Sequence, residues 1–252
     1  HPVKELADFL KGYGMHINYD AAHVAGLISG GEFQDPLREG VDTMTMSTHK
    51  TLFGPQGGLV LGFDRHAESI KKAMFPGLTS SHHIHHMAAK AVAFAEALEF
   101  GKDYSEQTIN NAKVLAAELN NVGFKVLGEK NGYTESHQTV VNVLDYGDGG
   151  TIEADLEKAN IIVNRQLIPG DLKANRHYMH PGGIRLGTSE ITRLGMKESE
   201  MKEIASMIKD VVIDKKESGE MMGKIAEFRK EFQKTQYCFD NKVGAYEYIK
   251  LR

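Results

Sequence analysis

The chain has 252 residues, of which 41% are hydrophobic and 25% are charged, as in an ordinary soluble globular protein with a sizeable core. Its net charge of -4 and pI near 6.3 give no electrostatic reason to expect a nucleic acid or a membrane as partner. The single cysteine, Cys238, excludes an intrachain disulfide and suits the reducing cytoplasm, and no apolar run is long enough to span a membrane.

The first part of the chain alternates short strands with helical pieces. A helix is predicted over 3–11 and helical turns over 21–30 and 35–40, the latter with Asp35 as N-cap and Pro36 at the first helical position. Strands are predicted over 15–20, 41–47 and 58–63. This alternation favours an α/β layer. The chain opens without methionine just before a strand that reads as buried, so we expect it to be the middle of a longer polypeptide.

The pattern of predicted elements changes after two long helices, an alanine-rich one over 84–100 and another over 103–121. Beyond them, shorter strands alternate with helices, so we place a domain boundary near residue 105, giving domains 1–105 and 106–252. The charged segment 217–236 is predicted to be an amphipathic helix with a solvated face. The other expected elements are strands over 124–127, 139–145 and 161–164, and helices over 151–159 and 197–214.

Two residues at strand ends carry the chemical signal of the sequence. Lys50 follows the run Ser47-Thr48-His49 and precedes the glycine pair Gly57-Gly58, and Asp20 ends an earlier strand. A lone lysine is usually a solvated surface residue, and a lone aspartate at a strand end is usually a turn or cap. Together they are what a pyridoxal phosphate enzyme needs, because the lysine holds the cofactor as a Schiff base and the aspartate keeps the pyridine nitrogen protonated.

Longer motifs around these residues resemble serine hydroxymethyltransferases, closest to the archaeal form. The resemblance covers nearly the whole chain in order and implies the aspartate-aminotransferase-like α/β architecture of fold-type I pyridoxal phosphate enzymes. The chain would supply part of the large domain plus the C-terminal small α/β domain. The motifs are Asp20–Leu27, Ser47–Thr51, Gly54–Gly58, Phe75–Gly77, Ala88–Ala91, Thr134–Gln138, Gly183–Thr188 and Thr192–Met196.

The resemblance implies a role for each residue near the cofactor. Lys50 corresponds to the lysine that holds pyridoxal 5'-phosphate, Asp20 to the partner of the pyridine nitrogen, and His23 to the residue near the ring oxygen. His49 matches the histidine next to that lysine. Ser47 stands where the family usually has threonine and keeps the hydroxyl. We therefore expect Lys50, His49 and Ser47 to be catalytic.

Substrate and phosphate contacts come from other segments. Arg185 falls on the arginine that binds the amino-acid carboxylate, a role that suits a planar two-pronged donor. Ser80 and Ser81 occupy the loop that reaches the neighbouring subunit's phosphate in the family. Two positions depart from the family pattern: Gln56 replaces an arginine near the cofactor, and Gln166 stands where folate-using members carry asparagine beside the pterin.

A histidine-rich stretch, Thr79–His86, follows Phe75-Pro76-Gly77. Its histidines have helical spacing for two metal ligands, but no carboxylate or cysteine lies nearby to complete a shell, so we expect no metal here. A contact with phosphate or with a second subunit is the favoured role, and an uninvolved helix start is the alternative.

The activity implied by the resemblance is the interconversion of serine and glycine with transfer of a one-carbon unit to a tetrahydropterin, either tetrahydrofolate or tetrahydromethanopterin. The same residues without a pterin would serve a threonine aldolase or transaldolase. An inactive fragment or assembly subunit is the third reading, because the upstream half of the family's sequence is absent here. We expect a cytoplasmic homodimer, or a companion chain that supplies the N-terminal half, with serine and glycine as ligands and with no nucleic acid or membrane partner.

Overall fold

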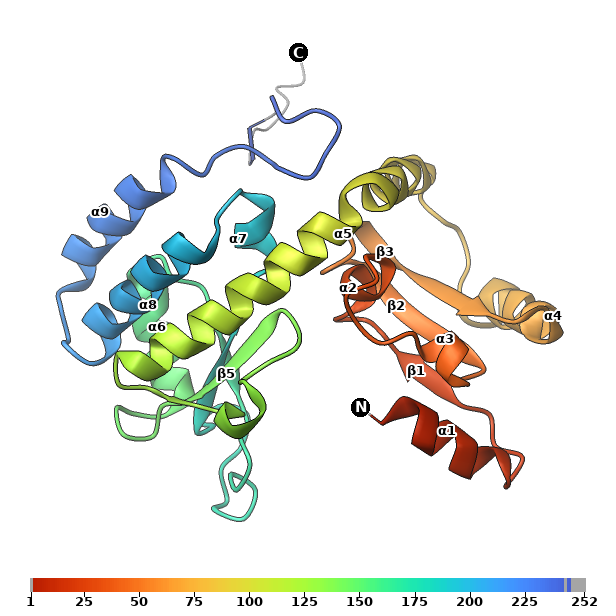
Figure 1. Ribbon diagram of the computed structural model, residues 1–252, viewed down its shortest axis with the longest axis horizontal. Coiled ribbons are helices and arrows are strands. Elements are labelled where there is room, and N and C mark those ends of the chain that lie inside the picture. Colours follow the sequence, from red (N-terminus) through yellow and green to blue (C-terminus); the bar gives the residue numbers. More distant parts are fainter. Residues whose placement is uncertain (1, 243, 246–252) are drawn as a thin grey trace. The chain divides into compact units, whose positions relative to one another are not determined.

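The computed structural model describes residues 2–242, 244 and 245, and it divides into two compact units. The first unit contains the residues up to Glu106 and the second those from Gln107 onwards. One long helix, α5 (Ile84–Asn121), begins in the first unit and ends in the second (Figure 1). Within the described residues, every helix is too short or too polar to cross a membrane.

The first unit is built on a three-stranded sheet in the order β1-β2-β3. β1 (Asn18–Asp20) is parallel to β2 (Thr43–His49), and β2 is antiparallel to β3 (Phe53–Gly62), with an irregularity in register near His49. Because β1 and β2 are parallel neighbours, their C-terminal ends point the same way. The helical elements of this unit are α1 (Val3–Lys11), α2 (Ala25–Ser29), α3 (Pro36–Glu39), η1 (Asp64–His66), α4 (Ala67–Lys72) and η2 (Ala73–Leu78).

The core of the first unit is small and is formed where α2 and α5 meet the sheet. Met44 and Met46 of β2 are buried there with Ala25 of α2 and Ala97 of α5. Gly26 allows the closest approach, since a Cβ atom at this position would lie 2.1 Å from the carbonyl oxygen of Thr51. The small residues of α2 therefore bring the segment after β1 directly against the turn after β2.

The second unit is built on a four-stranded antiparallel sheet in the order β4-β5-β7-β6, with a larger core that includes Leu115, Ile152, Ile184, Met201 and Ile208. Helix α6 packs against α8, and α9 lies along α8 (Figure 1). The elements are β4 (Lys125–Val126), η3 (Glu129–Asn131), β5 (Gln138–Asn142), α6 (Gly149–Lys158), β6 (Asn164–Gln166), β7 (Gly183–Gly187), α7 (Ser189–Arg193), α8 (Glu198–Val212) and α9 (Ser218–Arg229).

Three expectations about local structure were wrong. The two helices predicted over 84–100 and 103–121 are one helix, which runs through Gly101; a Cβ atom at Gly30 would lie 2.5 Å from the carbonyl oxygen of Gly101, so α5 packs closely on the end of α2 there. Helix α9 ends at Arg229 and does not continue to 236, although its buried Met221 and Ile225 agree with the amphipathic pattern. Asp35 stands at the N-cap position of α3, but its side chain pairs with Arg38 and makes no cap hydrogen bond.

Candidate functional site

The turn between β2 and β3 places Lys50 just after the C-terminal end of β2, at the edge of the sheet where β1 also ends. β2 ends at His49, and Lys50 follows at once with a half-buried side chain. Within the part of the chain that is described, its ammonium group makes no hydrogen bond or ion pair. A half-buried lysine whose amine is not engaged by a carboxylate is available for bond formation with a carbonyl ligand.

Asp20 is the last residue of β1, and it is aligned with Thr45 of the parallel neighbour β2. Its Oδ1 accepts a hydrogen bond of 2.9 Å from the backbone N–H of Ala22, which fixes the carboxylate against its own turn. Its Oδ2 makes no hydrogen bond among the described residues and the side chain is exposed, so one oxygen remains able to accept a proton-bearing group.

Thr51 ties the segment after Asp20 to the turn that carries Lys50. Its fully buried Oγ1 donates to the carbonyl of His23 at 2.8 Å and accepts from the N–H of Gly26 at 3.0 Å. The carbonyl of Gly26 also accepts from Ser105 Oγ of α5 at 3.1 Å. One buried hydroxyl thus fixes the lysine turn relative to the loop that follows the aspartate.

The residues just before Lys50 have separate tasks. Thr48 is buried, and its Oγ1 donates to the carbonyl of Pro55 at 2.7 Å, which closes the turn. His49 is exposed, and its Nδ1 accepts from the N–H of Gly57 at 3.3 Å, so the ring is held over the glycine turn. Ser47 is half-buried opposite Gly58 of β3, and its hydroxyl makes no hydrogen bond within the described structure. His23, in the turn before α2, is exposed.

The segment that precedes α5 is exposed. Ser80 and Ser81 lie in the connection between η2 and α5, and the imidazole rings of His83, His85 and His86 gather at the start of the helix. The ring centroids of His85 and His86 are 4.4 Å apart, and those of His83 and His86 are 5.4 Å apart. Burial lowers the pKa of His86, and the nearby His85 and His83 lower it further.

Arg185 belongs to the second unit. It lies in β7, between β5 and β6, and its Nη2 donates to Asn164 Oδ1 at 3.4 Å. The side chain is half-buried, so a guanidinium group is held on the sheet with most of its donors uncommitted. Gln166, at the end of β6, uses its amide nitrogen to bond the carbonyl of Leu167 at 3.1 Å.

The first unit therefore brings Asp20, His23, His49 and Lys50 to one end of its sheet, whereas Arg185 stands on the sheet of the second unit. Sequence reasoning missed Thr51 and Ser105, whose hydroxyls organise this end. The signal for Thr51 is its place directly after Lys50, combined with the small residues at 21–26 that admit a close approach. No comparable signal marks Ser105, because it lies within a helix far along the chain.

Comparison with known proteins agrees with these motifs. The family model described as "Serine hydroxymethyltransferase" matches residues 2–208. Curated serine hydroxymethyltransferases of Nitrosopumilus maritimus and Cenarchaeum symbiosum are 75% and 72% identical over 252 residues; they match the whole chain, which spans 57% of the length of each relative. The resemblance to archaeal members of this family is thereby confirmed.

A solved structure has the same fold. It is an L-threonine transaldolase from Pseudomonas fluorescens in the internal aldimine state, with a TM-score of 0.80 and 35% sequence identity, and the match covers 90% of this chain and 52% of that one. The prediction of a pyridoxal phosphate fold-type I architecture is confirmed.

Proposed function

Because the chain belongs to the serine hydroxymethyltransferase family, whose cofactor is pyridoxal phosphate, we propose that it works as part of an enzyme that interconverts serine and glycine and passes the one-carbon unit to a tetrahydropterin. The observation that carries the proposal is the buried Thr51 hydroxyl, which joins the lysine turn to the loop after Asp20. The chain spans 57% of the length of these relatives, so the activity is proposed for the whole protein.

The donor set fits this cofactor. Lys50 has an uncommitted amine at a strand end, and Asp20 has an uncommitted carboxylate oxygen at the end of the parallel neighbour. When bound, the cofactor supplies an electron sink for carbanion chemistry at the amino-acid Cα. Lys50 would hold it through its aldehyde carbon, and Asp20 would hold a proton at its pyridine nitrogen. His23 would lie by the ring oxygen, while Ser80 and Ser81 would bind phosphate.

The remaining residues act on the amino acid. Arg185 would bind the carboxylate bidentately and so orient serine for cleavage of the Cα–Cβ bond. Ser47 and His49 flank the lysine with a hydroxyl and an imidazole, which are suited to hold a proton near its Nζ atom. Lys50 itself would return as the amine that releases the product.

The acceptor is part of the proposal. We take it to be a tetrahydropterin, either tetrahydrofolate or tetrahydromethanopterin, and Gln166 is the residue we assign beside it. We place the enzyme in the cytoplasm as a homodimer, in which the segment Thr79–His86 of each subunit reaches the site of the other. The very exposed Leu78, just before this segment, and Ile84, within it, support an apolar contact there.

A threonine aldolase or transaldolase is the second candidate, favoured by the similarity to the L-threonine transaldolase structure. The experiment is to assay the full chain in its natural context with serine and with threonine, each with and without a tetrahydropterin. Serine cleavage that depends on the pterin supports the proposal. Pterin-independent cleavage of threonine alone assigns the second function, and failure to develop visible absorption with pyridoxal phosphate rejects both.

A further inference from the structure

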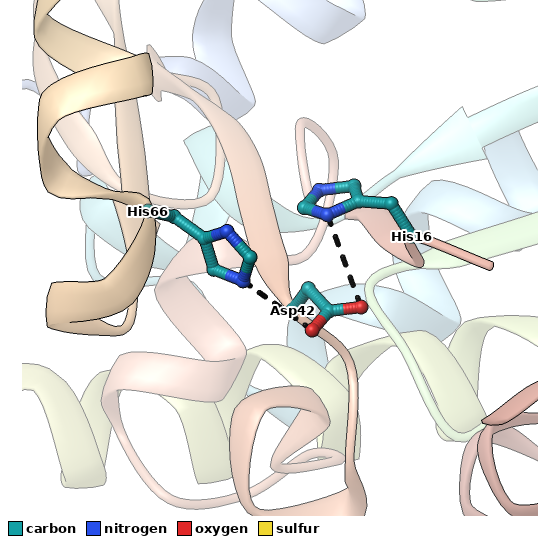
Figure 2. A group of neighbouring side chains, drawn as sticks. All are labelled: His16, Asp42 and His66. Atoms are coloured by element: carbon teal, nitrogen blue, oxygen red, sulfur yellow. Dashed lines mark hydrogen bonds and ion pairs between the residues drawn. The ribbon is translucent and has the colours of Figure 1, made fainter. Parts of the chain in front are cut away.

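A second cluster of chemically active side chains lies at the opposite end of the first unit's sheet from Lys50. His16 precedes β1, Asp42 precedes β2, and His66 follows β3, so the sheet brings three loops together (Figure 2). One ligand atom from each residue lies within 4.8 Å of the others. Because Asp42 and Lys50 bracket the two ends of β2, this cluster is separate from the proposed cofactor site.

Hydrogen bonds fix which ring nitrogen of His16 faces the carboxylate. The Thr43 hydroxyl donates to Asn18 Oδ1 at 2.9 Å, so Thr43 Oγ1 accepts from His16 Nε2 at 3.0 Å. The proton of the neutral ring is then on Nε2, and Nδ1 presents a lone pair 3.9 Å from Asp42 Oδ2. An outer hydrogen bond of this kind orients a metal-binding histidine.

His66 faces the same carboxylate through the ring nitrogen that also accepts a hydrogen bond from Arg65. Its Nε2 accepts from Arg65 Nε at 3.0 Å and lies 3.4 Å from Asp42 Oδ1. The carboxylate is charged at neutral pH, because hydrogen bonds from the Ile17 N–H and from Arg65 lower the pKa of Asp42 to about 2. Two imidazoles and one carboxylate therefore meet at one point, where the Arg65 guanidinium now supplies the positive charge through Nε to His66 and Nη2 to Asp42.

We propose that His16, Asp42 and His66 bind a divalent transition metal of the Zn²⁺ type, with water at the remaining position. Zinc lies about 2.0–2.2 Å from nitrogen and oxygen ligands, so one ion spans ligand atoms up to roughly 4.2 Å apart. The distance of 3.4 Å from His66 Nε2 to Asp42 Oδ1 and the distance of 3.9 Å from His16 Nδ1 to Asp42 Oδ2 are already within that span. The third distance, between the two imidazole nitrogens, is at most 4.8 Å, and rotation of the His16 ring can shorten it because that side chain is 52% exposed.

Arg65 is the competitor for this position. Its Nη2 donates to Asp42 Oδ1 at 2.7 Å, and the guanidinium carbon lies 4.7 Å from the centroid of the Phe63 ring. The side chain is 59% exposed, so it can leave the carboxylate and stay against Phe63 at little cost. The metal thus replaces both arginine contacts, the one with Asp42 and the one with His66, and links the loop before β1, the start of β2 and the turn after β3.

The test is zinc binding by the full chain in its natural context, loaded with pyridoxal phosphate and made without a histidine tag. Equilibrium dialysis should give one tightly held Zn²⁺ per chain, lost in the double variant His16→Asn, His66→Asn. Cofactor absorption and circular dichroism of that variant should stay unchanged, which shows that it folds. Because His82, His83, His85 and His86 also offer imidazoles, a variant with all four changed to asparagine is the matched control and should keep the ion.

Arg65→Gln provides the second measurement, and it should raise zinc affinity about fivefold by removing the competing cation. Zinc should also raise the unfolding temperature of the wild type but not that of the double variant. The proposal is overturned if zinc stoichiometry is the same in wild type and double variant, if it is lost with the 82–86 histidines instead, or if Arg65→Gln binds zinc no more tightly. If the double variant loses both zinc and its fold, the zinc affinity of Arg65→Gln alone decides the proposal.

Discussion

Lys50 is the residue on which the proposed chemistry depends most directly. Borohydride treatment of the cofactor-loaded protein should attach the cofactor irreversibly to the peptide that contains Lys50, as read by mass spectrometry. Lys50→Ala should abolish turnover, because it removes the amine that is proposed to hold the cofactor. Lys90, whose Nζ lies 3.4 Å from the carbonyl oxygen of Gly58, is the control: Lys90→Gln should leave the label on Lys50. Label on any other lysine would contradict the assignment.

Asp20 is proposed to act on the cofactor through its charge. A carboxylate about 4 Å from the pyridine nitrogen stabilises its proton by roughly 4 kcal/mol at an effective dielectric constant near 20, so Asp20→Asn should lower kcat by up to about a thousandfold. The variant should remain coloured but lose the long-wavelength absorption band that glycine induces. Asp20→Glu keeps the negative charge and should retain part of the turnover and part of the glycine-induced absorption band. A normal glycine band in Asp20→Asn would show that the carboxylate only fixes its turn through Ala22.

Thr51 acts by position. Thr51→Val preserves shape but removes the hydrogen bonds that the hydroxyl makes with the buried Gly26 N–H and the His23 carbonyl, which should cost about 2 kcal/mol of unfolding free energy. Because these bonds join the lysine turn to the loop after Asp20, cofactor affinity should fall as well. Thr51→Ser keeps the hydroxyl and is the matched control. Urea unfolding and an absorbance titration with pyridoxal phosphate measure the two effects; equal affinity in both variants would remove the positioning role.

At the scale of elements, Asp210 fastens α8 to α9 and to the turn between them. Its carboxylate lies 2.9 Å from Lys216 Nζ and 3.0 Å from Lys224 Nζ. Burial raises the pKa of Asp210, but the hydrogen bonds from the two lysines outweigh it and hold the pKa below the ordinary value near 3.8. A lowered folded-state pKa means that the stabilisation is present above about pH 4 and is lost as the pH falls further.

Asp210→Asn should therefore lower the unfolding free energy by about 2 kcal/mol at pH 7, and the difference from the wild type should shrink below pH 4. Urea titrations at pH 7 and pH 3 measure this. Asp214→Asn is the control, because Asp214 forms a more exposed pair with Lys209 and should change stability far less. A pH-independent difference for Asp210→Asn would assign the effect to packing.

Much of the fold follows from the sequence, and the failures have physical reasons. Pro36 and Gly40 delimit α3 through local backbone preferences, and the polar motif around Lys50 marks the end of β2. The run of α5 through Gly101 could not be predicted, because glycine is a poor helix former and the packing of the Gly101 carbonyl against Gly30 is a tertiary effect. The His16, Asp42 and His66 cluster was equally hidden, since only strand pairing brings three distant loops together.

At the scale of the whole molecule, the shared-site proposal predicts complementation between inactive variants. Replacing His82 and His83 with alanine should weaken cofactor affinity while leaving Lys50 able to be labelled. Mixing this variant with Lys50→Ala should restore one working site per hybrid dimer, because a two-fold contact exchanges the segment Thr79–His86 between subunits. Activity of the mixture no greater than the sum of the separate variants would rule out a shared site.

The link made by Thr51 also bears on how the chain acquires its site. Asp20, His23 and Lys50 belong to one continuous stretch of backbone, closed by a single buried hydroxyl, whereas Arg185 comes from the other unit. The entropy lost on closing a chain segment grows only with the logarithm of its length, so these three residues, which we propose to contact the cofactor, come together at small conformational cost. Substitutions that distort the sheet of the second unit should therefore weaken binding of the amino acid, while the protein keeps the visible absorption of bound pyridoxal phosphate.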